Sequence, residues 1–182
     1  MKKIYLILIM SIITFSCSDE SVNLEPLSIA NSKRSINSVS NSGDYNVAVT
    51  VSSDGTEWTY TITRAVTKAK SLSHFIIDLN NCGQDSATFA DIISATVNGN
   101  PANMSPSEGS GTGCDTQEIT TNFIKFDVQE ATSWVIILKY NRGYEISTTA
   151  TSWLKAGTSC HQAVIYAPGC PKGDVFEELS TL

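Results

Sequence analysis

Apolar and polar residues alternate along most of the chain after Asp44, and this period of two constrains the fold more than any other feature. In YNVAVTV (45–51) and EWTYTIT (57–63), Tyr, Val, Trp or Ile occupies every second position. Successive side chains of a β-strand point to opposite faces of a sheet. The alternation therefore predicts strands with one buried face and one wet face.

Turn-forming dipeptides divide this region into short strands. Asp54-Gly55 and Asn98-Gly99 each favour a tight hairpin turn, because the residues at its centre must accept positive φ angles. The segment SWVIILKY (133–140) is almost wholly apolar, which predicts a central strand covered on both faces. Many short strands without a sustained helical period predict an all-β fold, an immunoglobulin-like antiparallel β-sandwich. We expect it to form a single domain over residues 44–182.

The first residues show the three parts of a secretory signal peptide. Lys2 and Lys3 give a cationic start, residues 4–15 are almost unbroken apolar sequence, and Ser16 is a small residue before a cysteine. The apolar run is shorter than the roughly 20 residues that a membrane-spanning helix needs. We therefore expect residues 1–16 to be a lipoprotein signal peptide.

Cys17 stands where a bacterial lipoprotein carries its lipid. TFSC (14–17) resembles a lipobox, although Thr14 and Phe15 depart from its usual residues, and the acidic SDE (18–20) resembles the export signal of Bacteroidota-type cell-envelope lipoproteins. The resemblance implies that Cys17 carries acyl chains such as palmitate. Two chains suffice for stable anchoring, so it also implies attachment at the outer membrane or cell surface, facing the periplasm or the exterior. Plain secretion is the alternative.

Residues 17–43 are expected to form a lipidated, flexible linker. They are rich in Ser and Asn and contain no aromatic residue, so they lack the apolar surface that offsets the entropy of ordering. The net charge of the whole chain is −6. An acidic chain argues against a nucleic-acid partner, which requires patches of Lys and Arg. The expected membrane partner is reached through the lipid.

The other four cysteines predict two disulfides in an exported chain, and three pairings are possible. We predict Cys160–Cys170, because these residues flank a single strand, and Cys82–Cys114, because each lies in a long loop. The alternative is a zinc site. It is disfavoured because the chain has no C-x-x-C motif and the adjacent Cys160-His161 pair lacks the spacing of tetrahedral ligands. We predict no metal and no cofactor.

Candidate catalytic residues are few. The two histidines are His74 and His161. His74 and Asp78 share a face of one strand but are separated by about 13 Å, so they do not form a dyad by themselves, and we expect His161 to be structural. No nucleophile elbow, zinc-protease motif or phosphate loop appears. We predict that the protein is not an enzyme, and a hydrolase ranks third among the functions considered.

Three further residues are candidate sites of modification or binding. Ser86 lies in Asp-Ser-Ala (85–87), which matches the short O-glycosylation pattern of exported Bacteroidota-type proteins. Trp153 and Tyr144 lie in less periodic sequence than the other aromatic residues. They are therefore our candidates for exposed rings that contact a ligand.

Short motifs spread over residues 55–171 resemble small exported bacterial β-sandwich domains. They are W-T-Y-T (58–61), L-S-H-F (72–75), I-K-F-D (124–127), L-K-A-G (154–157) and A-P-G-C (167–170). The resemblance implies the fold and an envelope location, and it implies no activity. We expect a non-enzymatic binding module for a glycan or a protein. The alternative is a structural or adhesin-like subunit whose sheet edge or C-terminal tail docks a partner strand.

Overall fold

The computed structural model describes residues 34–106, 114, 122–146 and 149–173. These residues form two antiparallel sheets and two short 3-10 helices, η1 (Gly83–Asp85) and η2 (Phe89–Asp91). The first, sheet A, has the strand order β1 (Arg34–Asn41), β2 (Tyr45–Val51), β3 (Glu57–Arg64), β9 (Ser133–Tyr140), β5 (Ile92–Val97), β6 (Asn100–Pro101). The second, sheet B, has the order β11 (Ser159–Tyr166), β10 (Thr149–Ala156), β4 (His74–Asp78), β8 (Phe123–Asp127), β7 (Asn103–Pro106).

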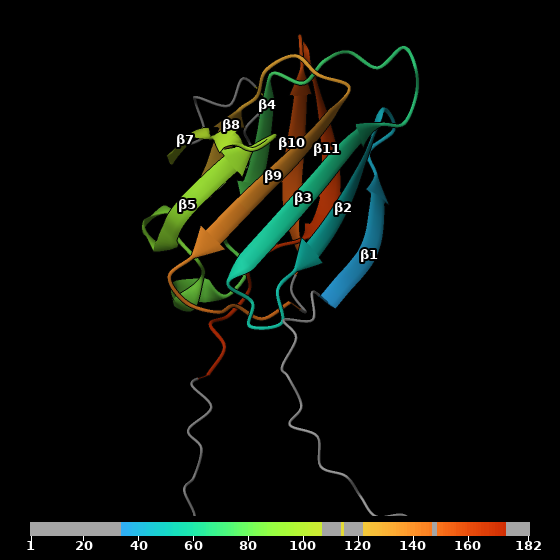
Figure 1. Ribbon diagram of the computed structural model, residues 1–182. Helices are drawn as coiled ribbons and strands as arrows, with labels where there is room; N and C mark the ends of the chain where they lie inside the picture. The colour runs from blue at the N-terminus through green and yellow to red at the C-terminus, as the bar shows by residue number, and fades with distance from the viewer. Residues whose placement is uncertain (1–33, 107–113, 115–121, 147–148, 174–182) are drawn as a thin grey trace, which may run out of the picture. The chain divides into compact units, whose positions relative to one another are not determined.

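The two sheets pack face to face, with sheet A in front of sheet B in the view of Figure 1. All the described residues belong to one compact unit. The predicted all-β, antiparallel sandwich is therefore confirmed.

The core lies between the sheets and is built from the residues that alternate in the sequence. The odd-numbered residues of β2 and the even-numbered residues of β3 from Trp58 to Ile62 are buried. Across the sandwich, the ring of Tyr60 in sheet A lies 5.8 Å from the ring of Phe75 in sheet B. Each large apolar side chain buried in this way contributes roughly 1.5–3 kcal/mol.

Strand β9 is central in its sheet, as predicted, but it is not covered on both faces. Trp134, Ile136 and Leu138 point into the core and are fully buried, whereas Val135 and Ile137 on the outer face are half-buried. The apolar run therefore reflects one core face and one partly exposed, β-branched face. That part of the prediction is wrong.

The pairing of β5 with β9 contains an irregularity that alternation alone does not reveal. The register shifts between Ile92 and Ser94. Ile92 packs against the core, while Ile93 is 67% exposed. A bulge adds one residue to one strand. Side chains that precede the bulge therefore point to the opposite face from the one that strict alternation would give them.

The predicted linker is wrong for residues 34–41. These residues form strand β1, which pairs with β2 from Arg34 opposite Val51 to Asn41 opposite Asn46, with a register shift between Ile36 and Ser40. An edge strand gains backbone hydrogen bonds from its neighbour, so it needs little apolar sequence of its own. Residues 17–33 of the predicted linker lie outside the described residues.

Both predicted disulfides are wrong, because the bonds are Cys82–Cys170 and Cys114–Cys160. Strands β4 and β11 are each antiparallel to β10 and so run in the same direction. Cys82 and Cys170, which follow the ends of these two strands, meet at the same end of sheet B, with their Cα atoms 5.1 Å apart. Cys160 is at the other end of β11, and eight extended residues span about 26 Å.

The two disulfides indicate an oxidising environment outside the cytoplasm, where such bonds form and persist. Within the described ranges, the structure contains no helix of sufficient length and hydrophobicity to cross a membrane.

Candidate functional site

A pocket of about 250 Å³ opens where the chain crosses between the sheets twice. One crossing runs from β6 in sheet A to β7 in sheet B, and the other runs from β8 in sheet B to β9 in sheet A. Amide and carboxylate side chains dominate the lining. The lining residues are Val97, Asn98, Asn100, Pro101, Asn103, Asp127, Gln129 and Glu130.

The first wall of the pocket is the turn Asn98-Gly99, which was predicted from the sequence. Both residues have positive φ angles, 50° and 80°. The Asn98 side chain fixes this turn to β9, because its Oδ1 accepts a hydrogen bond of 2.8 Å from the backbone N–H of Val135. Its Nδ2 donates to the Ser133 carbonyl at 3.4 Å. The side chain of Asn98 is therefore used to shape the pocket and is not free to move toward a ligand.

The second wall is the connection between β8 and β9, which carries Gln129 and Glu130. The indole Nε1 of Trp134 donates to the Gln129 carbonyl at 2.9 Å. Arg64 Nη2 donates to the Ala131 carbonyl at 2.7 Å, and the Ala131 N–H donates to Ser71 Oγ at 3.2 Å. These bonds fix the backbone of the wall and leave both exposed side chains available to a ligand.

Asp127 forms one side of the pocket and lies close to nitrogen atoms from three strands. Asn103 Nδ2 donates to Asp127 Oδ2 at 3.1 Å. The other oxygen, Oδ1, lies 2.8 Å from His74 Nδ1 and 3.2 Å from Lys125 Nζ. Asn103, Asp127 and His74 face one another in a single row across β7, β8 and β4. The register of sheet B thus fixes the orientation of the carboxylate.

The ring of His74 lies behind this carboxylate. Burial and the neighbouring charge of Lys125 lower the pKa of His74 below its ordinary value of 6.5, against the opposite influence of Asp127. The ring is therefore mostly neutral at pH 7, and its Nδ1 lies 2.8 Å from Asp127 Oδ1.

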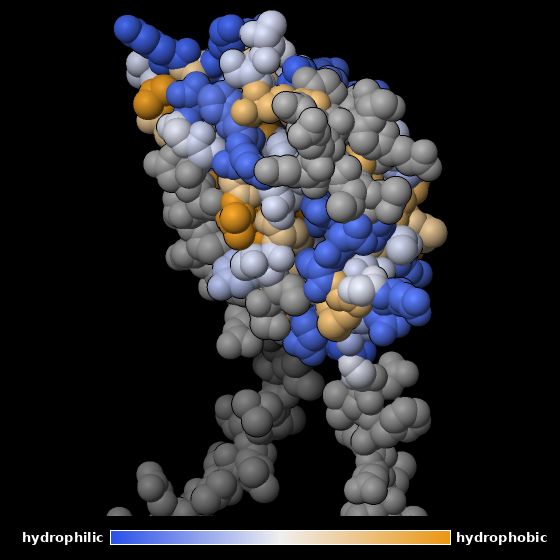
Figure 2. All heavy atoms as spheres, turned by 180° about the vertical axis from the view of Figure 1, so that it is seen from behind, coloured by the Kyte–Doolittle hydropathy of each residue, from blue (hydrophilic) through white to orange (hydrophobic). Residues whose placement is uncertain are grey.

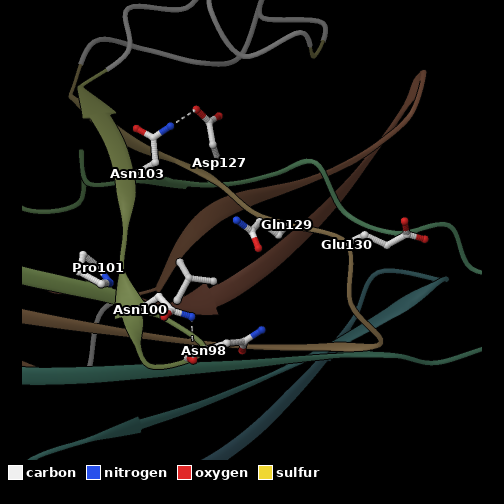
Figure 3. A pocket seen from close by; sticks show the side chains of 8 residues that line it. Asn98, Asn100, Pro101, Asn103, Asp127, Gln129 and Glu130 are labelled. Atoms are coloured by element: carbon white, nitrogen blue, oxygen red, sulfur yellow. Dashed lines mark hydrogen bonds between the residues drawn. The ribbon is translucent and has the colours of Figure 1, made fainter.

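Polar groups converge on the space inside the pocket (Figure 3). Asn103 and Asp127 lie on one side, Asn100 lies on another, and Gln129 projects between them. Glu130 lies at the outer end, with its carboxylate directed away from Gln129. Amide groups both donate and accept hydrogen bonds. The arrangement suits a small ligand with several hydroxyl groups, and Val97 and Pro101 supply apolar surface for its carbon atoms.

These lining residues were not predicted from the sequence as a site. Asn98-Gly99 was predicted only as a turn, and Asn100, Asn103 and Gln129 were not among the candidate residues. The signal was present in NGNPAN (98–103), where three asparagines fall within six residues around a turn and a proline. Polar residues on a loop that a rigid scaffold positions are frequent in binding sites.

The two aromatic candidates are not exposed, and that prediction is wrong. Tyr144 is 0% exposed and packs edge-on against Tyr140, with 5.2 Å between the ring centroids. Trp153 is 4% exposed and clusters with Ile76 and Phe123 on the outer face of sheet B. Cys114 also packs against this cluster. Outward-facing residues of a sheet are thus buried here by a second, smaller apolar cluster.

The remaining candidates are placed as follows. Ser86 is 4% exposed, and its Oγ accepts from the Cys82 N–H at 2.8 Å and donates to the Gly83 carbonyl at 2.9 Å. This burial contradicts the prediction of O-glycosylation at Ser86. His161 contacts residues of the fold: its Nε2 lies 3.6 Å from Asp44 Oδ2, and its ring is edge-on to the ring of Tyr45. Cys17 lies outside the described residues.

His74 is brought together with Asp127 and not with Asp78. The Asp78 side chain instead accepts a hydrogen bond from the backbone N–H of Asn80 at 2.9 Å. Among the described residues, the structure contains no group of three or more His, Cys, Asp or Glu side chains placed to hold a metal ion.

The fold and the site define an antiparallel β-sandwich with an amide- and carboxylate-lined pocket at the edge where the chain changes sheets. No protein-family model, curated protein or solved structure matches the chain.

Proposed function

We propose that the protein is a non-enzymatic binding module for a small glycan. The pocket formed by the two connections between the sheets would hold a single sugar ring of that glycan. The observation that carries this proposal is the lining, in which three asparagines, a glutamine and two carboxylates surround about 250 Å³. Pockets for drug-sized ligands occupy roughly 300–1,000 Å³. The smaller volume suits a single ring with hydroxyl groups directed at the amides.

The surface properties favour a glycan over a protein ligand. In Figure 2, which views the molecule from the side of sheet B, the described hydrophobic residues lie in separate patches among hydrophilic ones. The large hydrophobic residues that are exposed in the described ranges, Val66, Ile93 and Val164, lie on three different segments. Protein-binding surfaces usually gather apolar and aromatic residues into a contiguous patch.

The proposal includes attachment to the outer membrane or cell surface through a lipid on Cys17. The support is the lipobox-like TFSC (14–17) in the sequence, together with disulfides that indicate an oxidising location. A tethered module of this kind would hold glycans close to the cell that carries it.

A glycan array probed with the purified, disulfide-bonded protein tests the proposed binding. We expect binding to a subset of glycans, and we expect the double variant Asn100→Ala, Gln129→Ala to lose it. Both side chains line the pocket without bracing the fold, apart from a 3.5 Å contact from Asn100 Nδ2 to the Asn98 carbonyl. The matched control is Gln84→Ala, an exposed amide in η1. An array without signal, or equal binding by the double variant, would contradict the proposal.

A further inference from the structure

Every charged side chain that lines the pocket is acidic. Asp127 and Glu130 are the charged members of the lining, and none of the described lining residues is Lys, Arg or His. The chain as a whole carries a net charge of −6. Both the local and the overall charge therefore disfavour the approach of an anionic ligand.

The two carboxylates differ in how far their charge is compensated. Asp127 has Lys125 Nζ at 3.2 Å and His74 Nδ1 at 2.8 Å, and it accepts a hydrogen bond from Asn103. Glu130 is exposed, and among the described residues none forms an ion pair with it. The negative charge at the outer end of the pocket is thus the uncompensated one.

Arg64, whose guanidinium bonds to the backbone of the second wall, is already engaged with the fold. Arg64 donates to the Ala131 carbonyl and lies 5.9 Å from the centroid of the Trp134 ring. Its side chain is held by these groups, so it is not free to swing into the pocket and receive a ligand carboxylate.

We infer that the pocket discriminates among sugars by charge, preferring an amine-bearing sugar to its neutral counterpart and rejecting the corresponding uronic acid. This inference rests on the proposed function, because it concerns the same pocket. Glu130 is its principal determinant, and Asp127 adds to the discrimination from inside the pocket. Since Glu130 is exposed, solvent and salt screen its effect, and we expect a preference of about threefold to tenfold at low salt.

Isothermal titration calorimetry with sugars that share one ring separates charge from shape. The probes are glucose, glucosamine and glucuronate, with the galactose series as a second set, each at low salt and at about 1 M salt, where the Debye length is about 3 Å. We expect the amino sugar to bind tightest and the uronic acid weakest at low salt, and the differences to shrink at high salt. Glu130→Gln should reduce the discrimination. The matched control Glu145→Gln, which removes an equal charge beyond the opposite end of β9, should preserve it.

The outcomes separate the two proposals. Equal binding of the three forms of a ring overturns the inference and leaves the proposed function standing. Tightest binding of the uronic acid, or discrimination unchanged by Glu130→Gln, also overturns the inference alone. No binding by any of the six sugars contradicts the proposed function and the inference together.

Discussion

Two glycines, Gly55 and Gly143, permit a close backbone approach at the end of the sandwich where β2 turns into β3. A Cβ on Gly143 would collide with the Asp54 carbonyl, and one on Gly55 would collide with the Tyr144 carbonyl. Gly55 also has a φ angle of +78°. This is the turn predicted from Asp54-Gly55, although within it only the glycine takes a positive φ.

We expect Gly55→Ala to lower the free energy of unfolding by more than about 2 kcal/mol, because it combines steric overlap with an unfavourable φ angle. The control is Gly173→Ala, which meets no atom within 4 Å and should change little. Urea denaturation measures both. Equal stability of the Gly55→Ala variant and the wild type would show that the two backbone segments do not approach as described.

We predict that the free energy of unfolding depends on pH through His74, and the sign of this dependence follows from the surroundings of the ring. Burial first, and Lys125 second, lower the pKa of His74 below 6.5. The unfolded chain therefore binds more protons than the native state in the window just below pH 6.5, so stability falls as the pH drops through this window. We expect the urea midpoint of wild type to fall more between pH 7.5 and 5.5 than that of His74→Asn.

Asp54 and Asp91 do not interfere with this measurement. The pKa of each is lowered below its ordinary value of 3.8, for Asp54 mainly by the hydrogen bond from Ser52 and for Asp91, against the effect of burial, by hydrogen bonds from Thr88. Their stabilisation is complete above that value and is lost only as the pH falls through the lowered pKa. Parallel losses in wild type and His74→Asn between pH 7.5 and 5.5 would contradict the account of His74.

At the scale of elements, the disulfide between Cys82 and Cys170 joins the ends of β4 and β11. It closes a loop of 88 residues, so the chain-entropy model predicts a loss of about 4–5 kcal/mol in the free energy of unfolding for the double variant Cys82→Ala, Cys170→Ala. Urea denaturation of the variant and of wild type measures the difference.

Peptide mapping without reductant tests the pairing directly. We expect one linked peptide pair to contain Cys82 and Cys170 and the other to contain Cys114 and Cys160. A pair that joins Cys82 to Cys114 would contradict the strand order of sheet B.

The elements differ in how far sequence reasoning could predict them. The strands β2 and β3 are evident because alternation is local, and the Asn98-Gly99 turn is evident because few residues other than Gly and Asn accept positive φ. The disulfide pairing was not accessible, because it depends on which strands run in the same direction. Strand β1 was not predicted because most of its residues are Ser or Asn. Its pairing with β2, which the sequence alone does not reveal, stabilises it.

The candidate site was hidden for a related reason. Its walls are two connections that lie about 30 residues apart in the chain and meet only because both change sheets between the same layers. Each polar residue of the pocket resembles an ordinary loop residue when read alone. By contrast, Trp153 and Tyr144 looked like binding residues because their surroundings lack periodicity, and both are buried.

At the scale of the whole molecule, the proposed anchor predicts where the protein is found in the cell. We expect the full chain to fractionate with membranes and to incorporate a labelled fatty acid. Cys17→Ser should be released from the membrane and remain unlabelled, because the acyl chains provide the attachment. The control is Cys114→Ser with Cys160→Ser, which removes a disulfide and leaves Cys17 in place. Membrane association of Cys17→Ser equal to wild type would contradict lipid anchoring.

The central claim is that the pocket formed by the β6–β7 and β8–β9 connections binds a sugar. A two-dimensional ¹H–¹⁵N NMR titration of the disulfide-bonded protein with glucosamine and galactosamine tests it most directly, because the side-chain amides of Asn100, Asn103 and Gln129 give their own signals. We predict concentration-dependent shifts in these signals and in the backbone amides of 98–103 and 128–130. An unchanged spectrum, or shifts confined to the opposite end of the sandwich around Tyr144, would contradict the claim.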